Sequence, residues 1–144
     1  MKRFLSVIVA LIMLPIGATA QQGDLVVSDE WARPILIAGR PGGAYFTIKN
    51  NSSADDKLVG VMSSVSARVE MHEHTMKDGV MKMSQVMSID VPAGGEVELK
   101  PGGYHIMLFE TKSKYGPGDK IDLTLKFESG ATIEKELAVM AKQP

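Results

Sequence analysis

The chain contains no cysteine, and this absence excludes several kinds of linkage and site. Without thiols there is no disulfide, no thiolate metal ligand and no cysteine nucleophile, so packing alone must stabilise the fold. A lipid-anchored precursor would also need a cysteine at its cleavage site. An excess of positive charge is missing as well, because 16 basic residues stand against 17 acidic ones. This balance argues against nucleic acid as a partner.

Long apolar runs are equally scarce, and the one near the start has the features of a secretory signal. Two basic residues precede an apolar stretch over 4–16, and Ala18-Thr19-Ala20 provides a small-residue cleavage site. A membrane-spanning helix needs about 20 consecutive apolar residues, which this run does not reach. We therefore expect a cleaved signal peptide at 1–20, a soluble secreted domain at 21–144 and no membrane anchor.

Apolar and polar residues alternate through most of the mature chain, with turn residues recurring every few positions. This pattern is typical of an antiparallel β-sandwich, and helical periodicity is not sustained anywhere. We expect one domain. Its predicted strands are Leu25–Trp31, Ala44–Asn50, Lys57–Met62, Ala67–His74, Val80–Val86, Ser88–Val91, Glu96–Lys100, His105–Phe109, Lys120–Phe127 and Thr132–Val139.

Several residues are assigned to the core on their chemistry and their place in a strand. Methionine is ordinarily a flexible core filler, and large aromatic side chains are usually buried. Strand alternation places every second residue of the ninth strand on one apolar face. The predicted core therefore includes Ile121, Leu123, Leu125, Phe127, Trp31, Tyr45, Met62, Met87 and Met140.

Histidine and methionine are concentrated in two parts of the chain. The three histidines are His72, His74 and His105, and five of the ten methionines lie within 71–87. Strand alternation places His105 and Met107 side by side on one face. Thioether sulfur is a soft, neutral donor that binds copper(I) well and zinc, magnesium or calcium poorly. A mixed set of imidazoles and thioethers therefore selects copper(I).

Two other kinds of copper protein lack their defining group here. A blue-copper electron carrier needs a cysteine thiolate beside two histidines, and this chain has none. Proteins that bind copper through an N-terminal histidine and its amine are excluded because the expected mature terminus is Gln21.

The spacing of the candidate ligands points to one family. His72 is followed after ten residues by Met83, and after a further twenty-one residues by His105 and Met107 in a His-x-Met arrangement. This pattern resembles that of the periplasmic copper chaperones of the PCuAC type. The resemblance covers nearly the entire mature chain and includes Trp31-Ala32-Arg33-Pro34, the stretch from Gly43 to Ile48, Glu70 to Met83, Pro92-Ala93-Gly94-Gly95 and Pro101 to Leu108.

The resemblance implies a single-domain, antiparallel Greek-key β-sandwich or barrel of the cupredoxin-like class. It also implies one copper(I) ion per chain, held by His72, Met83, His105 and Met107, in a periplasmic protein that is not an enzyme. The implied recipient is the dinuclear copper site in subunit II of cytochrome c oxidase, alongside a thioredoxin-like copper assembly factor. We expect a monomer.

The choice between two histidines stays open at this point. A tight two-residue turn at Asp78-Gly79 would pair Met83 with His74, whereas the family spacing selects His72. We take His72 as the ligand and His74 as a neighbour of the site. Met76 and Met81 are reserve donors, and the C-terminal segment carries too few donors for a second, copper(II) site.

Three functions compete on this sequence. The first is a metallochaperone that passes copper(I) to a receptor by ligand exchange. The second is a copper-buffering or copper-tolerance protein with the same ligands. The third is an interaction sandwich without metal, whose methionines serve only packing. An enzyme is disfavoured because no nucleophile-and-base pair or open-site zinc motif is present.

Overall fold

The computed structural model describes residues 23–144, which form strands and turns without any helix among them. The predicted signal peptide at 1–20 lies outside the described residues. Within 23–144, accordingly, no helix is long and apolar enough to cross a membrane. The strands are β1 (Leu25–Ala32), β2 (Gly42–Asn50), β3 (Asp56–Met62), β4 (Ser66–Lys77), β5 (Val80–Val86), β6 (Ile89–Val91), β7 (Glu96–Glu98), β8 (Tyr104–Thr111), β9 (Lys120–Phe127) and β10 (Thr132–Val139).

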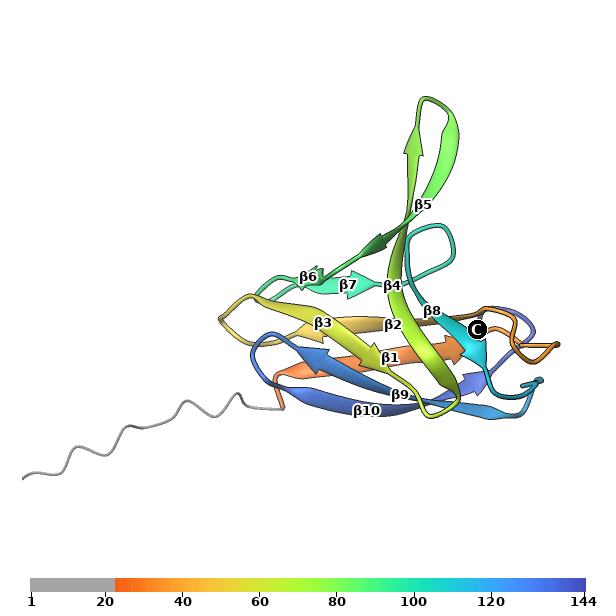
Figure 1. Ribbon diagram of the computed structural model, residues 1–144. Coiled ribbons are helices and arrows are strands. Elements are labelled where there is room, and N and C mark those ends of the chain that lie inside the picture. Colours follow the sequence, from red (N-terminus) through yellow and green to blue (C-terminus); the bar gives the residue numbers. More distant parts are fainter. Residues whose placement is uncertain (1–22) are drawn as a thin grey trace, which may run out of the picture.

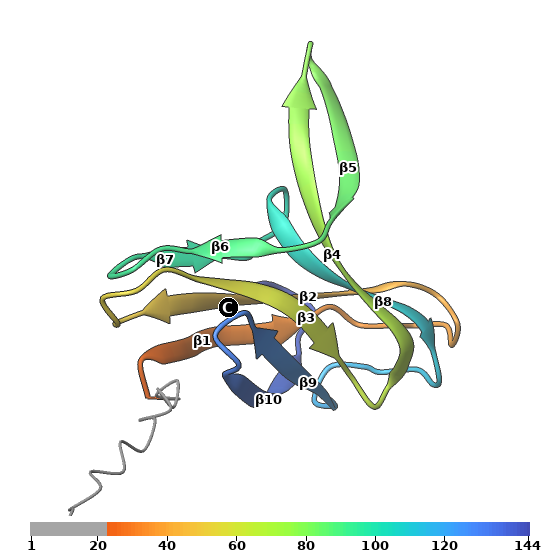
Figure 2. The ribbon, with the colours of Figure 1, turned by 60° about the vertical axis from the view of Figure 1, so that its left-hand side comes forward.

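The ten strands form one sheet that curls over its own core. They hydrogen-bond in the order β5-β4-β8-β2-β1-β10-β9-β3-β6, and β7 pairs with β2. Strands that are far apart in this order also lie against each other. β3 contacts β4, and β6 contacts β2 and β7 (Figures 1 and 2). The sandwich predicted from the alternation is thus confirmed. It contains one parallel pair, β1 with β10, among antiparallel ones.

The core lies inside this curled sheet and is built from alternate residues of most strands. In β9 the side chains of Ile121, Leu123, Leu125 and Phe127 are all buried, as predicted from their spacing. Burial of such side chains contributes about 1.5–3 kcal/mol each relative to exposure. A cluster of this kind stabilises the domain without a disulfide.

The methionine assignments were partly wrong. Met62 is 49% exposed and Met87 is 79% exposed. In β3 a bulge between Leu58 and Gly60 shifts the register, so Val61 turns inward and Met62 turns outward. Met87 lies in a bend after β5 rather than in a strand. Trp31 and Tyr45 are buried as predicted, and Met140 is partly buried.

Two buried polar side chains form hydrogen bonds to the loops at one end of the molecule. The side-chain amide of Asn50 donates hydrogen bonds to the carbonyl oxygens of Ala54 at 2.8 Å and Val91 at 3.0 Å. The carboxylate of Asp56 accepts a 2.6 Å hydrogen bond from the Ser129 hydroxyl. Because buried polar groups are costly unless they are paired, these bonds fix the chain between β2, β3 and β6.

A long hairpin made by β4 and β5 projects from the body of the sheet (Figures 1 and 2). Lys77 pairs with Val80 around a two-residue turn. In this turn Asp78 has a φ of 52° and Gly79 a φ of 76°. Positive φ at both central residues defines a type I′ turn, for which Asp-Gly is a preferred sequence. Asp78-Gly79 therefore forms the tight turn, which was one of two possibilities left open by the sequence.

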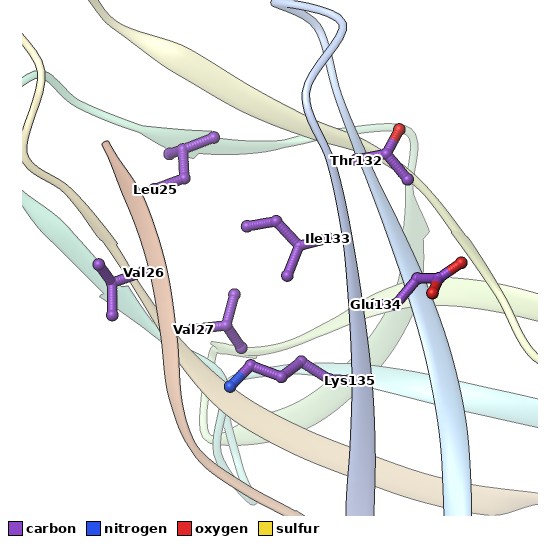
Figure 3. Close-up of a pocket in the computed structure, with 7 residues that line it drawn as sticks. All are labelled: Leu25, Val26, Val27, Thr132, Ile133, Glu134 and Lys135. Atoms are coloured by element: carbon purple, nitrogen blue, oxygen red, sulfur yellow. The ribbon is translucent and has the colours of Figure 1, made fainter. Parts of the chain in front are cut away.

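A shallow groove lies where β1 and β10 separate. These strands pair only at Trp31–Ala138 and Ala32–Val139 within the described residues, and they diverge toward the opposite end of β1. Figure 3 shows Val27 and Ile133 pointing into the space between the strands. The lining is mixed, with Thr132, Glu134 and Lys135 beside four apolar residues, and it includes none of the candidate metal ligands.

Candidate metal centre

The candidate ligands come from β4, β5 and β8, three neighbouring strands at one end of the sheet order. In β8 the side chains of Ile106 and Leu108 are fully buried in the core, so His105 and Met107 occupy the other face. His72 pairs with His105 across the β4–β8 ladder. Residues directly opposite in a ladder share a face, so this register brings the predicted donors of β4 and β8 together.

The second ladder adds the remaining predicted ligand. Met83 pairs directly with His74 between β5 and β4, while His72 pairs with Gln85. The structure therefore has the register of the tight turn, and all four predicted ligands share one face. Met83 is 45% exposed because β5 is the edge strand at this end of the sheet.

His72 nevertheless has the central position among the predicted donors. In the β4–β8 ladder His72 is opposite His105 and diagonal to Met107, which pairs with Glu70. In the β4–β5 ladder His72 is diagonal to Met83. Diagonal neighbours on one sheet face are separated by about 7–8 Å between backbones, within reach of long side chains. His74 is two positions further along β4 and is a diagonal neighbour of His105 but not of Met107.

The three imidazole rings form one group. The ring centroids of His72 and His105 are 5.9 Å apart, and those of His74 and His105 are 4.7 Å apart in a stacked arrangement. His72 and His105 are both buried, whereas His74 is partly exposed. The structure thus places His74 beside the predicted ligands as well.

The hydrogen bonds of His72 determine which of its nitrogens is free. Its Nε2 lies 2.8 Å from Oε2 of Glu70, whose carboxylate is also paired with the Arg68 guanidinium. An ionised carboxylate can only accept, so Nε2 carries the proton and Nδ1 retains its lone pair. These contacts also lower the pKa of Glu70, the His72 hydrogen bond having the largest effect. The Nδ1 atom of His72 is buried and has no hydrogen-bond partner among residues 23–144.

In His105 the other ring nitrogen, Nε2, is the one left without a proton. Its Nδ1–H donates a 3.0 Å hydrogen bond to the carbonyl oxygen of Gly103, so Nε2 retains the lone pair. Burial lowers the pKa of His105, and the positive charge of nearby Arg33 lowers it further, although the Gly103 hydrogen bond raises it. His105 is therefore neutral at neutral pH, which is the form that binds metals.

The donor chemistry of this face fits a soft cation. Two imidazole nitrogens with free lone pairs stand beside two thioethers, and Nδ1 of His74 is a further buried atom without a partner in the described chain. Residues 23–144 contain no group of three or more His, Asp or Glu arranged to hold a metal ion. The thioethers beside the imidazoles are soft donors, which favour copper(I).

An aromatic and cationic border lies next to the histidines on the adjoining strands. The rings of Trp31 and Tyr45 stack with centroids 4.6 Å apart, and the Arg33 guanidinium lies 5.7 Å from the Tyr45 centroid. Gly43 pairs with Met107, and a side chain at Gly43 would meet the Tyr45 hydroxyl at 2.9 Å. The absence of a side chain at Gly43 thus lets Tyr45 approach the methionine end of the site.

Sequence reasoning missed the role of Glu70. The pattern Glu-x-His over 70–72 places the carboxylate and the imidazole on the same strand face, and this spacing was the available signal. Metal-binding histidines generally donate their second N–H to a carboxylate or a carbonyl, which fixes the orientation of the ring. His72 and His105 both have this arrangement, through Glu70 and Gly103.

Comparisons with known proteins identify the family of the chain. The family described as "Putative lipoprotein LpqE-like" matches residues 25–139. A relative from Leifsonia xyli subsp. xyli, with the same lipoprotein description, is 38% identical over 113 residues, which cover 78% of this chain and 67% of the relative.

Two solved structures share the fold. The copper-bound PCuAC domain from PmoF2 aligns with a TM-score of 0.70 at 24% identity, covering 83% of this chain and 95% of that domain. The solution structure of CuI-DR1885 from Deinococcus radiodurans aligns with a TM-score of 0.58 at 28% identity, covering 88% of this chain and 84% of that chain. PCuAC domains have a cupredoxin-like β fold, so the predicted fold class is confirmed.

Proposed function

The chain belongs to the LpqE-like family, a family of the PCuAC type, and from that premise we propose that it is a periplasmic copper(I) metallochaperone. In this proposal one ion is held by His72, Met83, His105 and Met107. Two similar domains have been solved with copper, one of them as copper(I), which supports a copper-binding role for this chain. The lipoprotein description of the family supports a location outside the cytoplasm.

The position of His72 is the observation that carries the ligand assignment. Its unpartnered Nδ1 lies on a face where His105 is opposite and both methionines are diagonal neighbours. An unpaired buried polar atom costs free energy, and a bound cation would remove that cost. The ligand set would be neutral, so the loaded site would carry the single positive charge of copper(I).

The exposure of Met83 favours delivery over storage. Met83 belongs to the edge strand and is 45% exposed, while His72 and His105 are buried. A receptor ligand can therefore reach the ion from the side of Met83 and replace this thioether first. The ion then passes to the receptor by stepwise exchange, with the two histidines released last. A storage protein would be better served by ligands that are all shielded from solvent.

The proposed recipient is the dinuclear copper site in subunit II of cytochrome c oxidase, with a thioredoxin-like copper assembly factor as an accessory partner. The resemblance of the ligand motif to the PCuAC chaperones supports this choice. Trp31 and Tyr45 form a stacked pair near Arg33 at the border of the site. Because Trp31 and Tyr45 are buried, the exposed Arg33 is the part of this border that a receptor would contact, and it leaves Met83 open.

The decisive experiment is a transfer assay. The copper(I)-loaded chain is mixed without oxygen with an apo form of the soluble oxidase copper domain, and the metal content of both proteins is measured after separation. Delivery predicts that copper moves to the oxidase domain, faster than from a small chelator of equal affinity. If copper stays on the chain while the apo domain accepts it from the chelator, the protein is a copper buffer instead.

A further inference from the structure

The outer part of the β4–β5 hairpin carries thioethers that the proposed copper(I) site does not use. Past Glu73, β4 leaves the β8 ladder and continues with β5 as a two-stranded extension away from the body (Figures 1 and 2). Met76 lies opposite Met81 in this extension, and the two residues are 64% and 53% exposed. They are therefore not core fillers.

The two faces of this extension differ in chemistry. Because residues directly opposite share a face, the register sorts the hairpin into two sets. One face carries His74, Met76, Met81 and Met83, and the other carries Glu73, Thr75, Lys77, Val80 and Lys82. All the charged side chains of these sets lie on the second face. The methionine face is continuous with the face that carries His72 and His105.

The turn geometry brings the outer methionine side chains close together. Around a two-residue turn the closing pair, Lys77 and Val80, is hydrogen-bonded, so the next pair is of the non-hydrogen-bonded kind. Such pairs have Cα atoms about 4.5 Å apart and the closer side chains. Met76 and Met81 form this pair, and Met83 follows two residues along β5 on the same face.

We propose that Met76 and Met81 form a second, weaker copper(I) site at the outer end of the hairpin, sharing Met83 with the first site. This inference rests on the proposed function, because its ion is the same cargo. Thioethers select a soft cation. The site is weaker because it contains no imidazole and because binding must order flexible, exposed side chains. Its effect is to extend the copper(I)-binding face from the histidines to the hairpin.

A titration of the mature chain with copper(I) tests the proposal. The methionine methyl groups are labelled with carbon-13, and their NMR signals are followed without oxygen as copper(I) is added. We expect the first equivalent to shift the signals of Met83 and Met107. Further copper(I) should then shift those of Met76 and Met81. If Met76 and Met81 do not respond after the first site is filled, the hairpin site does not exist.

Two variants separate the hairpin site from the first site. Met76→Leu/Met81→Leu nearly conserves side-chain volume, so we expect it to abolish the second step while the first affinity stays within about threefold. Met62→Leu, which replaces an exposed methionine elsewhere, is the matched control and should leave both steps unchanged. If the second step persists in the double variant, the assignment to Met76 and Met81 is wrong.

A third variant distinguishes failure of this inference from failure of the proposed function. In His72→Ala/His105→Ala we expect the first step to be lost and the weak hairpin step to remain. If the hairpin step disappears as well, the two sites are not separate and the inference is overturned. A first step that is unchanged in this variant contradicts the proposed function instead, since its ligands would lie elsewhere.

Discussion

His72 lies directly opposite His105 in the β4–β8 ladder, and their ring centroids are 5.9 Å apart. The two rings leave different nitrogens free for a metal. Nε2–H of His72 donates to Glu70, whereas Nδ1–H of His105 donates to the carbonyl oxygen of Gly103. Both tautomers are thus set before any ion arrives. Preorganised ligands lose less conformational freedom on binding, which raises affinity.

The first prediction separates His72 from His74. We expect His72→Ala to weaken copper(I) binding at least about tenfold more than His74→Ala, a difference of about 1.4 kcal/mol. The reason is that His72 neighbours all three other proposed ligands, whereas His74 is distant from Met107. Competition with a chromophoric copper(I) chelator measures both affinities. The reverse order would assign the ligand role to His74, the direct partner of Met83.

The second prediction concerns the two ligands of β8. His105→Ala and Met107→Leu should each weaken copper(I) binding by about tenfold or more. Leucine nearly conserves the volume of methionine, so a loss at 107 reports the sulfur and not a cavity. Circular dichroism and thermal unfolding verify that both variants are folded. Undiminished affinity in both would remove β8 from the site.

The third prediction concerns Glu70 as a positioning residue. Removing the carboxylate in Glu70→Ala should weaken copper(I) binding by about 10–100-fold, the usual effect of losing a partner of a metal-binding histidine. Nitrogen-15 shifts of the His72 ring should also change in the metal-free protein, since its tautomer is no longer fixed. Glu70→Gln retains a hydrogen-bond acceptor, so it should keep part of the copper(I) affinity and part of the natural His72 ring shifts. Unchanged ring shifts in Glu70→Ala would show that Glu70 does not orient His72.

Much of the fold could be predicted from the sequence because the local signals agree with one another. Three predicted strands, Val80–Val86, Lys120–Phe127 and Thr132–Val139, have the observed bounds. The Asp78-Gly79 turn fixes the hairpin register through backbone preference alone. The parallel pairing of β1 with β10 could not be predicted, because it joins the two ends of the domain and no connecting turn specifies it.

Part of the arrangement of the candidate site could be predicted from the sequence, but its contacts could not. Alternation placed His105 and Met107 on one face, and the structure agrees. The role of Glu70 was missed because the Glu-x-His spacing shows that the two side chains share a face but not that they are hydrogen-bonded. Met62 was misassigned because methionine is usually a core filler, and the bulge in β3 that turns this residue outward leaves no clear mark in the sequence.

The fourth prediction concerns metal choice. Two imidazoles and two thioethers should discriminate by softness, so zinc should fail to displace copper(I) even in large excess. Titration of zinc into the copper(I)-loaded chain, with released copper detected by a chelator, measures this. Tight zinc binding at the same residues would contradict the proposed ligand set.

The fifth prediction follows from the lowered pKa of His105, which burial causes first and the positive charge of Arg33 reinforces. Its pKa in the unfolded chain is about 6.5. Between that value and the lower folded value, the unfolded state binds more protons than the folded state. The metal-free protein should therefore lose stability as the pH falls from about 6.5 through the folded pKa, by at most about 1.4 kcal/mol per pH unit from this group.

Above about pH 6.5 the same group should contribute no slope, because it is neutral in both states. In His105→Asn the side-chain amide can still donate to Gly103 but does not titrate, so this variant should gain stability relative to the natural chain as the pH falls. Urea unfolding at a series of pH values measures the difference. An equal pH dependence in both proteins would show that His105 is not held neutral by its surroundings.

The same protonation should govern copper(I) binding. Protons compete with copper for the imidazoles, while thioethers do not titrate, so each histidine that becomes protonated weakens binding by up to about tenfold per pH unit. Because the pKa of His105 is lowered, its share of this loss should begin below about pH 6.5. A chelator competition from pH 7 to 4 measures the curve. A flat affinity over this range would mean that no histidine holds the ion.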